Sequence, residues 1–398
     1  MLKPNFTFKS LLFATMIAVS LASCSDDDDE NPVVVQPDLR AKIDYAKITP
    51  TTPYKALFVD AKGDTTVDLT VGNNRYKMFQ ALNYYLGSPV RDSKTADATL
   101  MKNMFANTSN PFFNIDAAPI KVVGATLNAA GISLKEKTAT SKSANEVAAT
   151  NSYLETSFAA LAEASKSVSA EATKGVAGKA GTYLLDKNGI EHAQIIQKGL
   201  IGALQLDYIS NVLLVKGLEA DNKSLVSGKK YTALEQNWDE AYGLLTLNPV
   251  YLLGATDAVR TSPESFIGSY IWEYNKANYA KIHPAFVTGR AAIVNNDAAM
   301  LKTQATFIRT EMERSIAMAA LGYLGKWKSG TTDAARAHAM GEGLGFIYSL
   351  RYCTINGADA AFSDGILLGL IGSANGFWDL TPEKINTASA AITAKFKL

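Results

Sequence analysis

Apolar residues recur every three or four positions along most of this chain, a spacing that predicts α-helices. The clearest case is segment 190–216, where Ile195, Ala203 and Leu213 follow one stripe. Lys198 and Asp207 interrupt this apolar segment, so we interpret it as a central core helix and not as a membrane span. The same spacing predicts helices at 73–86, 96–106, 143–167, 231–247, 263–279, 295–324, 334–352, 363–371 and 382–396.

Two stretches depart from the helical pattern. In segment 54–71, β-branched residues flank the turn sequence Ala61-Lys62-Gly63-Asp64, which predicts one small β-hairpin. Segment 174–181 is rich in glycine and lysine and is predicted to be a flexible loop. A long series of helices with one N-terminal hairpin predicts an all-α fold built from helical bundles.

Two of the predicted helices resemble each other. Each contains a glutamate in an apolar context and a glycine three residues later: Glu240 with Gly243, and Glu342 with Gly345. Because a glycine inside a helix costs about 1 kcal/mol relative to alanine, we expect another backbone or a ligand to approach very closely there. His338 lies one helical turn before Glu342.

Each of these two helices follows a long core helix, which favours an internal duplication. The two lobes would be residues 72–230 and 231–398, arranged as a pair of helical bundles. The alternative is a chance similarity, because the shared signature is one glutamate and one glycine.

The N-terminus has the pattern of a lipoprotein. Residues 1–23 combine lysines, a short apolar run and small residues, as in a secretory signal peptide, and Cys24 stands at the cleavage point. We expect acyl chains on Cys24 to anchor the protein in a membrane. An acidic run at 25–30 resembles the signal that exports such lipoproteins to the outer face of the outer membrane. Residues 24–53 would be a flexible tether, and 54–398 the helical domain.

The overall charge gives no reason to expect nucleic acid as a partner. The chain has 39 basic and 38 acidic residues, so no basic excess attracts a polyanion. It has two cysteines. If Cys24 carries lipid, Cys353 has no partner for an intramolecular disulfide and is most simply a small buried residue.

The sequence resembles a known family in four segments, 189–203, 238–243, 338–348 and 376–380. The family is the lipoproteins grouped as domain of unknown function 4856, which in turn resemble the imelysins. The resemblance implies an imelysin-like fold of two four-helix bundles and a link with iron acquisition. The imelysin hallmark Gly-x-His-x-x-Glu is not reproduced, because His338 and Glu342 are four residues apart, so no site is carried over.

Several residues are candidates for binding a ligand. We expect the ligand to bind in the cleft between the two Glu/Gly helices, lined by side chains from both helices and from a neighbouring core helix. His338 and Glu342 are also candidate metal ligands, with iron or haem as the implied cofactor. The structural alternative is that His338 and Glu342 form a hydrogen-bonded pair and that Glu240 and Glu342 brace helices, for example by pairing with Arg309. Arg309 is also expected to pair with Glu313, one turn away. The candidates are Trp238, Glu240, Arg309, His338, Glu342 and Gly345.

The residues do not select an enzyme. No Gly-x-Ser-x-Gly elbow is present, and Cys353 has no histidine near it in the sequence. We therefore expect a ligand-binding lipoprotein on the cell surface, with an outer-membrane uptake receptor or another envelope protein as a partner. The alternative is an accessory interaction lipoprotein without a small-molecule ligand, and peptidase activity by analogy with imelysins ranks last.

Overall fold

The computed structural model describes residues 39–245, 254, 256–260 and 264–398. The predicted signal peptide, the lipidated Cys24 and the acidic run lie outside the described residues. Within the described part, none of the helices is both long enough and apolar enough to cross a membrane. One compact unit extends over Asp38–Leu398.

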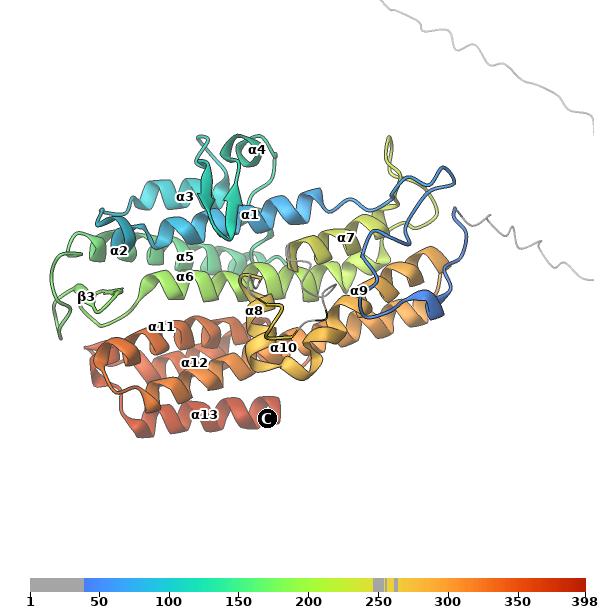
Figure 1. Cartoon of the computed structure of the whole chain (residues 1–398). Helices are drawn as coiled ribbons and strands as arrows, with labels where there is room; N and C mark the ends of the chain where they lie inside the picture. Colours follow the sequence, from blue (N-terminus) through green and yellow to red (C-terminus); the bar gives the residue numbers. More distant parts are fainter. Residues whose placement is uncertain (1–38, 246–253, 255, 261–263) are drawn as a thin grey trace, which may run out of the picture. The chain divides into compact units, whose positions relative to one another are not determined.

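The described chain is mostly α-helical, as predicted (Figure 1). Its α-helices are α1 (Thr70–Leu86), α2 (Ser88–Asp92), α3 (Ala98–Ala106), α4 (Gly124–Asn128), α5 (Ala144–Ser165), α6 (His192–Leu200), α7 (Ala233–Leu245), α8 (Ile267–Tyr274), α9 (Lys276–Asn295), α10 (Ala298–Ser329), α11 (Asp333–Ser349), α12 (Ala360–Ile371) and α13 (Pro382–Phe396). A π-helix, η3 (Ile201–Leu213), continues α6. Short 3-10 helices are η1 (Tyr45–Lys47), η2 (Lys135–Lys137), η4 (Lys216–Glu219), η6 (Leu350–Tyr352) and η7 (Gly376–Asp379).

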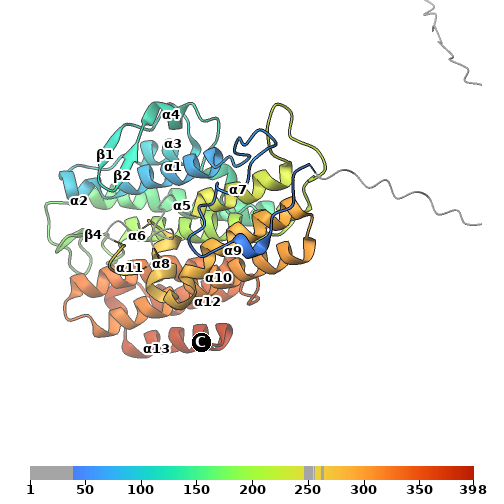
Figure 2. The ribbon, with the colours of Figure 1, turned by 45° about the vertical axis from the view of Figure 1, so that its right-hand side comes forward.

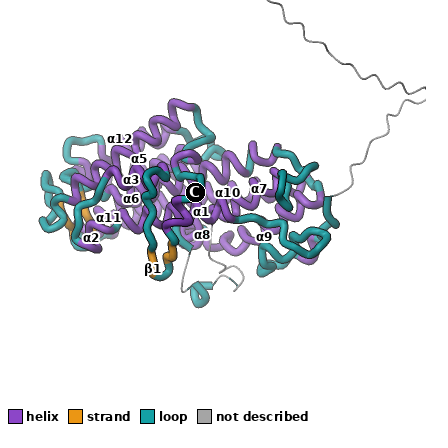
Figure 3. Tube along the Cα trace, turned by 90° about the horizontal axis from the view of Figure 1, so that it is seen from above, coloured by secondary structure: helices purple, strands orange, loops and turns teal. Residues whose placement is uncertain are grey.

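Two small antiparallel hairpins accompany the helices. Strand β1 (Ile115–Ala117) pairs with β2 (Ile120–Val122), and β3 (Gly178–Ala180) pairs with β4 (Tyr183–Leu185). Figure 3 shows how little of the folded unit these strands occupy. The second hairpin falls partly in segment 174–181, which was predicted to be a loop; strands of three residues are too short to give a recognisable alternation of polar and apolar positions.

The helices pack around the central α6–η3 segment. Helix α5 and helix α7 contact it on one side, and α11 and α10 contact it on the other. Helices α1 and α3 cover α5 and α7, while α12 and α13 lie outside α10 and α11 (Figures 1 and 2). The central segment is therefore surrounded by protein, as the interruption of its apolar stripe by only a few polar residues predicted.

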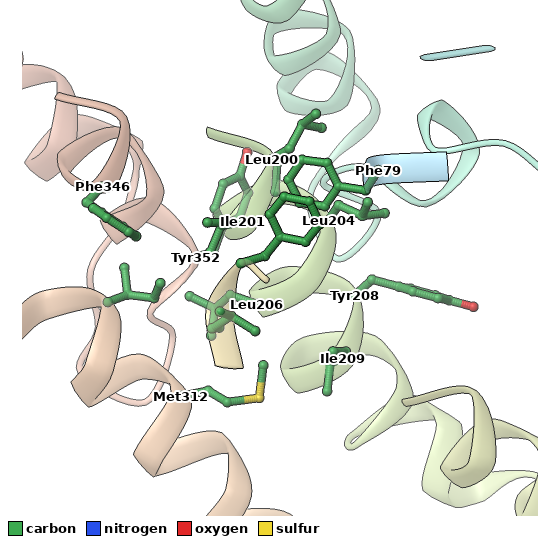
Figure 4. Close-up of a cluster of buried hydrophobic side chains, with 14 of the residues drawn as sticks. Phe79, Leu200, Ile201, Leu204, Leu206, Tyr208, Ile209, Met312, Phe346 and Tyr352 are labelled. Carbon is green, nitrogen blue, oxygen red and sulfur yellow. The ribbon is translucent and has the colours of Figure 1, made fainter. Parts of the chain in front are cut away.

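The core converges on this central segment. Leu200, Ile201, Leu204, Leu206 and Ile209 are all fully buried, and Figure 4 shows them facing side chains from three other regions. Those neighbours are Phe79 of α1, Met312 of α10, and Phe346 and Tyr352 of the α11–η6 segment.

Side-chain caps begin many of these helices where the sequence allows. Ser143 and Glu146 form a capping box at the start of α5. Asp97 and Asp297 accept a hydrogen bond from the first turns of α3 and α10, and Thr332 does the same for α11. These local signals explain why the predicted starts of these helices agree with the structure to within a few residues.

The N-terminal hairpin predicted at 54–71 is reduced to one bridge. Val59 and Thr65 form an isolated antiparallel β-bridge, supported by a 2.8 Å hydrogen bond from Thr66 N to Phe58 O. No strand forms there. The buried Thr66 and Phe58 instead pack on helices, so the turn is held by tertiary contacts and not by a sheet.

Residues 39–53, expected to belong to the tether, pack on the helices where they are described. Arg40 pairs with Glu235 of α7. Ile43 N donates to Asn295 Oδ1 at 2.7 Å, and Tyr45 donates to an Asp297 carboxylate oxygen at 3.0 Å. The folded unit therefore includes these residues as well as those from Tyr54 onward.

The helix predicted at 263–279 is two helices in the structure. Helix α8 ends at Tyr274 and α9 runs from Lys276 to Asn295, with Asn275 at the break. The Asn275 amide donates to Glu311 Oε2 at 2.6 Å, which holds the break against α10. Most of α9 is buried on several faces, so its sequence lacks the one-sided stripe that reveals a helix.

Candidate functional site

The glycines of α11 bring α6 unusually close. A Cβ added at Gly345 would lie 2.5 Å from the Cβ of Lys198, and one at Gly341 would lie 3.0 Å from the Cβ of Glu191. The expectation that another backbone approaches these glycines is met by α6 and the residue before it. The close contact places Glu342 of α11 beside the polar side chains of α6.

Lys198 and Glu342 form a buried ion pair. The Lys198 Nζ lies 2.8 Å from Glu342 Oε1, and Lys198 is only 1% exposed. Its ammonium also donates to Gln194 Oε1 at 2.7 Å and to Gln197 Oε1. Burial lowers the pKa of Lys198, although Glu342 opposes this effect. Burial alone would raise the pKa of Glu342, but the charge and hydrogen bond of Lys198 hold it below its ordinary value.

His338 pairs with Glu191 and not with Glu342. Its Nδ1 lies 2.7 Å from Glu191 Oε2, and its ring stacks on Tyr183 with centroids 4.0 Å apart. Burial raises the pKa of Glu191, and the interaction with His338 opposes this rise. Hence the predicted pair of His338 with Glu342 is replaced by two separate interactions, one for each residue.

A pocket adjoins this polar network. It has a volume of about 370 Å³ and lies between α1, α2, the β3–β4 turn and the start of α6, at the end of the fold where Figure 1 labels α2 and β3. We call it the α2–β4–α6 pocket. Glu191, Gln194 and Gln197 belong both to the network and to the pocket wall. The lining residues are Asn83, Leu86, Gly87, Pro89, Val90, Arg91, Leu161, Thr182, Tyr183, Leu184, Glu191, Ala193, Gln194 and Gln197.

Glu240 lies in a different network. Its Oε1 is 3.3 Å from Arg75 Nη2 of α1, and it also interacts with the hydroxyl of Tyr208 in η3. Burial raises the pKa of Glu240, and Arg75 opposes this effect. Because Glu240 is held by α1 and η3 whereas Glu342 is held by α6, the two glutamates do not share the single cleft that the sequence suggested.

The other candidates have structural surroundings. Trp238 is fully buried, and its Nε1 donates to Phe286 O at 2.9 Å. Gly345 packs against α6, as described above. Arg309 donates to Thr354 Oγ1 at 3.4 Å.

Glu313, the expected partner of Arg309, accepts hydrogen bonds from another segment. Its carboxylate accepts from the backbone N–H of Ile355 at 3.0 Å and from the Asn356 side chain at 3.1 Å. The pairings of Glu240 or Glu342 with Arg309 are replaced by pairings with Arg75 and Lys198.

Sequence reasoning missed two further buried groups of charges. Arg290 of α9 lies 2.6 Å from Glu235 and 2.9 Å from Asp239, and all three are fully buried. The second group that sequence reasoning missed contains Lys198 and Glu191. The available signal was Lys198 itself, a lysine inside the most apolar predicted helix, which needs a buried anion to be tolerated.

A second hollow has a different character. It lies between α12 and α13, has a volume of about 450 Å³ and is mostly apolar. Leu368 belongs to α12 as well, although it does not line the hollow, and it is 72% exposed. Gly365 and Gly369 line the hollow, and an added Cβ at either would meet no neighbouring atom.

Side chains that bind metal ions do not cluster in the described part of the chain. Across residues 39–245 and 264–398, no group of three or more histidine, cysteine, aspartate or glutamate side chains is placed to hold a metal ion. Cys353 is buried, and burial raises the pKa of its thiol well above the ordinary value. It packs as a small core residue.

The fold and the site define an all-α protein with a buried ion network beside a small pocket whose wall is partly polar and partly apolar. The chain belongs to the family described as domain of unknown function (DUF4856), whose family model matches residues 55–398. Neither the curated proteins nor the solved structures contain a significant match.

Proposed function

We propose that this protein is an outer-membrane lipoprotein, anchored through Cys24 and facing the cell exterior, whose helical domain binds a small ligand in the α2–β4–α6 pocket. The anchor rests on the signal-like residues 1–23, Cys24 and the acidic run 25–30. The binding role rests on the pocket and the ion network beside it.

One observation carries the binding role. Glu191 is 6% exposed, yet it lines the pocket. Burying a carboxylate costs free energy unless it is paired, and a protein that needed only packing would be more stable with an apolar residue there. Buried charges at the wall of a pocket are typical of binding sites.

The pocket replaces the cleft between the Glu/Gly helices as the binding site. His338 and Glu342 stay part of the proposal because His338 holds Glu191 at the pocket wall and Glu342 pairs with Lys198 behind it. Iron and haem, the ligands implied by the imelysin resemblance, are tested together with organic ligands. A link with iron acquisition, and an uptake receptor as partner, would follow if either bound.

The binding test uses the chain without its signal peptide. Haem, ferric citrate and a library of small polar metabolites are titrated by calorimetry against the native protein and against Ala193→Trp. Ala193 lines the pocket, so the indole should fill it and abolish binding. Ala149→Trp, at an exposed position of α5, is the matched control and should bind normally. A ligand that binds equally to the Ala193→Trp variant would contradict the proposed site.

The location has its own test. Palmitate labelling in the producing bacterium should mark the native chain and not Cys24→Ala. Protease added to intact cells should degrade the labelled protein if it faces the exterior. Labelled protein that becomes sensitive only after the cells are broken would contradict the outward orientation.

The second candidate function is an accessory protein that acts through its surface, and the α12–α13 hollow favours it. Exposed Leu368 and part of the apolar hollow belong to the same helix, α12, so a second copy could place its leucine in the hollow across a twofold axis. Glu383 and Lys384 line the same hollow and provide opposite charges for such a contact. Light scattering should then show a dimer that Leu368→Asp dissociates and Leu225→Asp, at another exposed leucine, does not.

A further inference from the structure

We propose that the ligand of the α2–β4–α6 pocket carries an ammonium group, which pairs with Glu191, and oxygen atoms that accept hydrogen bonds from the amides of Asn83 and Gln194. This inference rests on the proposed function, because it names the chemical class of ligand for the same pocket.

The charges around the pocket are unequal. Lys198 is matched by Glu342, at 2.8 Å. Arg91, the only basic residue in the lining, is matched by its neighbour Asp92, at 2.9 Å. Glu191 is the only acidic residue in the lining; its contact partner is the imidazole of His338, and it shares the longer-range charge of Lys198 with Glu342. A ligand cation would supply the missing positive charge, whereas an anion would be repelled by Glu191.

The geometry leaves one oxygen of Glu191 for such a cation. Oε2 is engaged by His338 at 2.7 Å. Oε1 has no protein partner among the described hydrogen bonds and ion pairs. It is also not completely buried, so a bound group can reach it. Since Glu191 lines the pocket, this oxygen is the one available to a bound ammonium group.

The three amide side chains of the wall point to oxygen acceptors on the ligand. The Lys198 ammonium occupies the carbonyl oxygens of Gln194 and Gln197, and the Gln197 amide donates to the carbonyl oxygen of Asn83. These contacts fix the orientation of each amide. The NH₂ groups of Asn83 and Gln194 are then the donors left for the pocket, and donors call for hydroxyl or carbonyl oxygens.

The remaining wall is apolar and limits the size of the ligand. Leu86, Pro89, Val90, Leu161 and Leu184 contribute hydrocarbon surface to a pocket of about 370 Å³. A single amino sugar or the end of a peptide has the required ammonium group, oxygen acceptors and small apolar body. Both sources share the same chemistry, and matched probes distinguish them.

The experiment compares two pairs of probes that differ only in the ammonium group. Glucosamine is paired with glucose, and leucinamide is paired with 4-methylpentanamide. Calorimetry at pH 7 on the full mature chain should show that the charged member of at least one pair binds at least tenfold more tightly than its neutral partner. Binding by the sugar pair identifies a saccharide ligand, and binding by the amide pair identifies a peptide end.

Glu191→Gln keeps the shape of the side chain and removes its charge. It should reduce the preference for the charged probe to less than twofold, while Glu163→Gln, at an exposed position of α5, should leave it unchanged. Circular dichroism would establish that both variants are folded. A tenfold preference that survives Glu191→Gln would overturn the assignment of the cation to this carboxylate.

Failure of this inference can be told apart from failure of the proposed function. Equal binding of charged and neutral probes, or binding of neither member of both pairs, would overturn the ammonium class. If a neutral or anionic ligand still bound to the native chain and not to Ala193→Trp, the pocket would remain a binding site. If no compound in the library bound in a way that Ala193→Trp blocks, the proposed function itself would fail.

Discussion

Helices α7 and α11 carry the same short signature but lie in different surroundings. In α7, Gly243 faces α1: an added Cβ would lie 3.1 Å from Leu69 O, and Glu240 pairs with Arg75 of the same helix α1. In α11, Gly345 faces α6, and Glu342 pairs with Lys198. The signature therefore marks a helix that packs closely on a neighbour, and the neighbour determines what its carboxylate does.

The two regions differ most in their access to a pocket. Around α7, Glu235, Asp239 and Arg290 are fully buried and bind one another and the N-terminal residues Arg40 and Tyr54. Around α11, the ion network reaches the α2–β4–α6 pocket through Glu191. We infer that the charges near α7 fix the structure, whereas those near α11 are placed for binding.

The largest loss of stability is expected when one buried basic side chain is replaced in each region. Arg290→Met removes the described ion-pair partner of Asp239 and leaves Glu235 with Arg40 alone, so it should destabilise the protein by about 3–5 kcal/mol, the usual cost of breaking a buried pair. Lys198→Met removes the ion-pair partner of Glu342 and a longer-range charge from Glu191, which lines the pocket and keeps its contact with His338, so this change should cost about half as much. Urea unfolding followed by circular dichroism measures both values. Equal costs would remove the distinction between a structural and a binding network.

A smaller change in stability is expected when the glycines of α11 are replaced by alanine. Gly345→Ala would place a Cβ 2.5 Å from that of Lys198, and the resulting overpacking should cost about 1–3 kcal/mol. Gly343→Ala is the matched control in the same helix, because its Cβ would meet Tyr323 Cβ at an ordinary 3.4 Å. This control should gain up to about 1 kcal/mol from the higher helix propensity of alanine. The midpoints of urea unfolding should therefore shift in opposite directions. A stabilising Gly345→Ala would show that close packing of α6 on α11 is not the role of this glycine.

The comparison of α7 with α11 shows which features could be predicted from the sequence and which depend on tertiary contacts. Helix periodicity predicted the all-α fold and most helices, because it is a local property of the chain. For Gly345 the sequence predicted the close approach of either another backbone or a ligand, and the structure shows the backbone of α6 there. The partners were not predictable: Glu191 and His338 are 147 positions apart in the sequence, and nothing local pairs them.

The same limit applies to α9 and to the pocket. Helix α9 is buried on several faces, so periodicity does not mark it. The pocket draws on α1, α2, the β3–β4 turn and α6, which lie far apart in the sequence. Its chemistry depends on which polar side chains of α6 face outward, and that depends on the glycines of α11. Lys198 was visible as an anomaly, but its role required the tertiary structure.

The smallest expected effect distinguishes Glu191, which lines the pocket, from Glu342, which does not, by the sign of their pH dependence. The pKa of Glu191 is raised chiefly by burial, so its ionised form costs stability at neutral pH, and this cost should disappear as the pH falls towards the ordinary value of 4.5. Glu191→Gln should therefore stabilise the protein by about 1 kcal/mol at pH 7 and by less at each lower pH. His338, Lys198 and Glu342 are the ionisable groups of the network around it.

Glu342 should behave in the opposite way. Its pKa is held below 4.5 by Lys198 despite burial, so its ion pair stabilises the protein above pH 4.5 and is lost as the pH falls through the lowered pKa. Glu342→Gln should destabilise the protein at pH 7, and the difference from the native chain should shrink only below pH 4.5. Differential scanning calorimetry of both variants between pH 7 and pH 3.5 measures the two trends. Opposite signs at pH 7 would mean that Lys198 serves Glu342 and leaves Glu191 short of a cation, as ligand binding requires. If both variants were destabilised equally, Lys198 would be shared by the two carboxylates and the pocket would have no unmatched charge to offer.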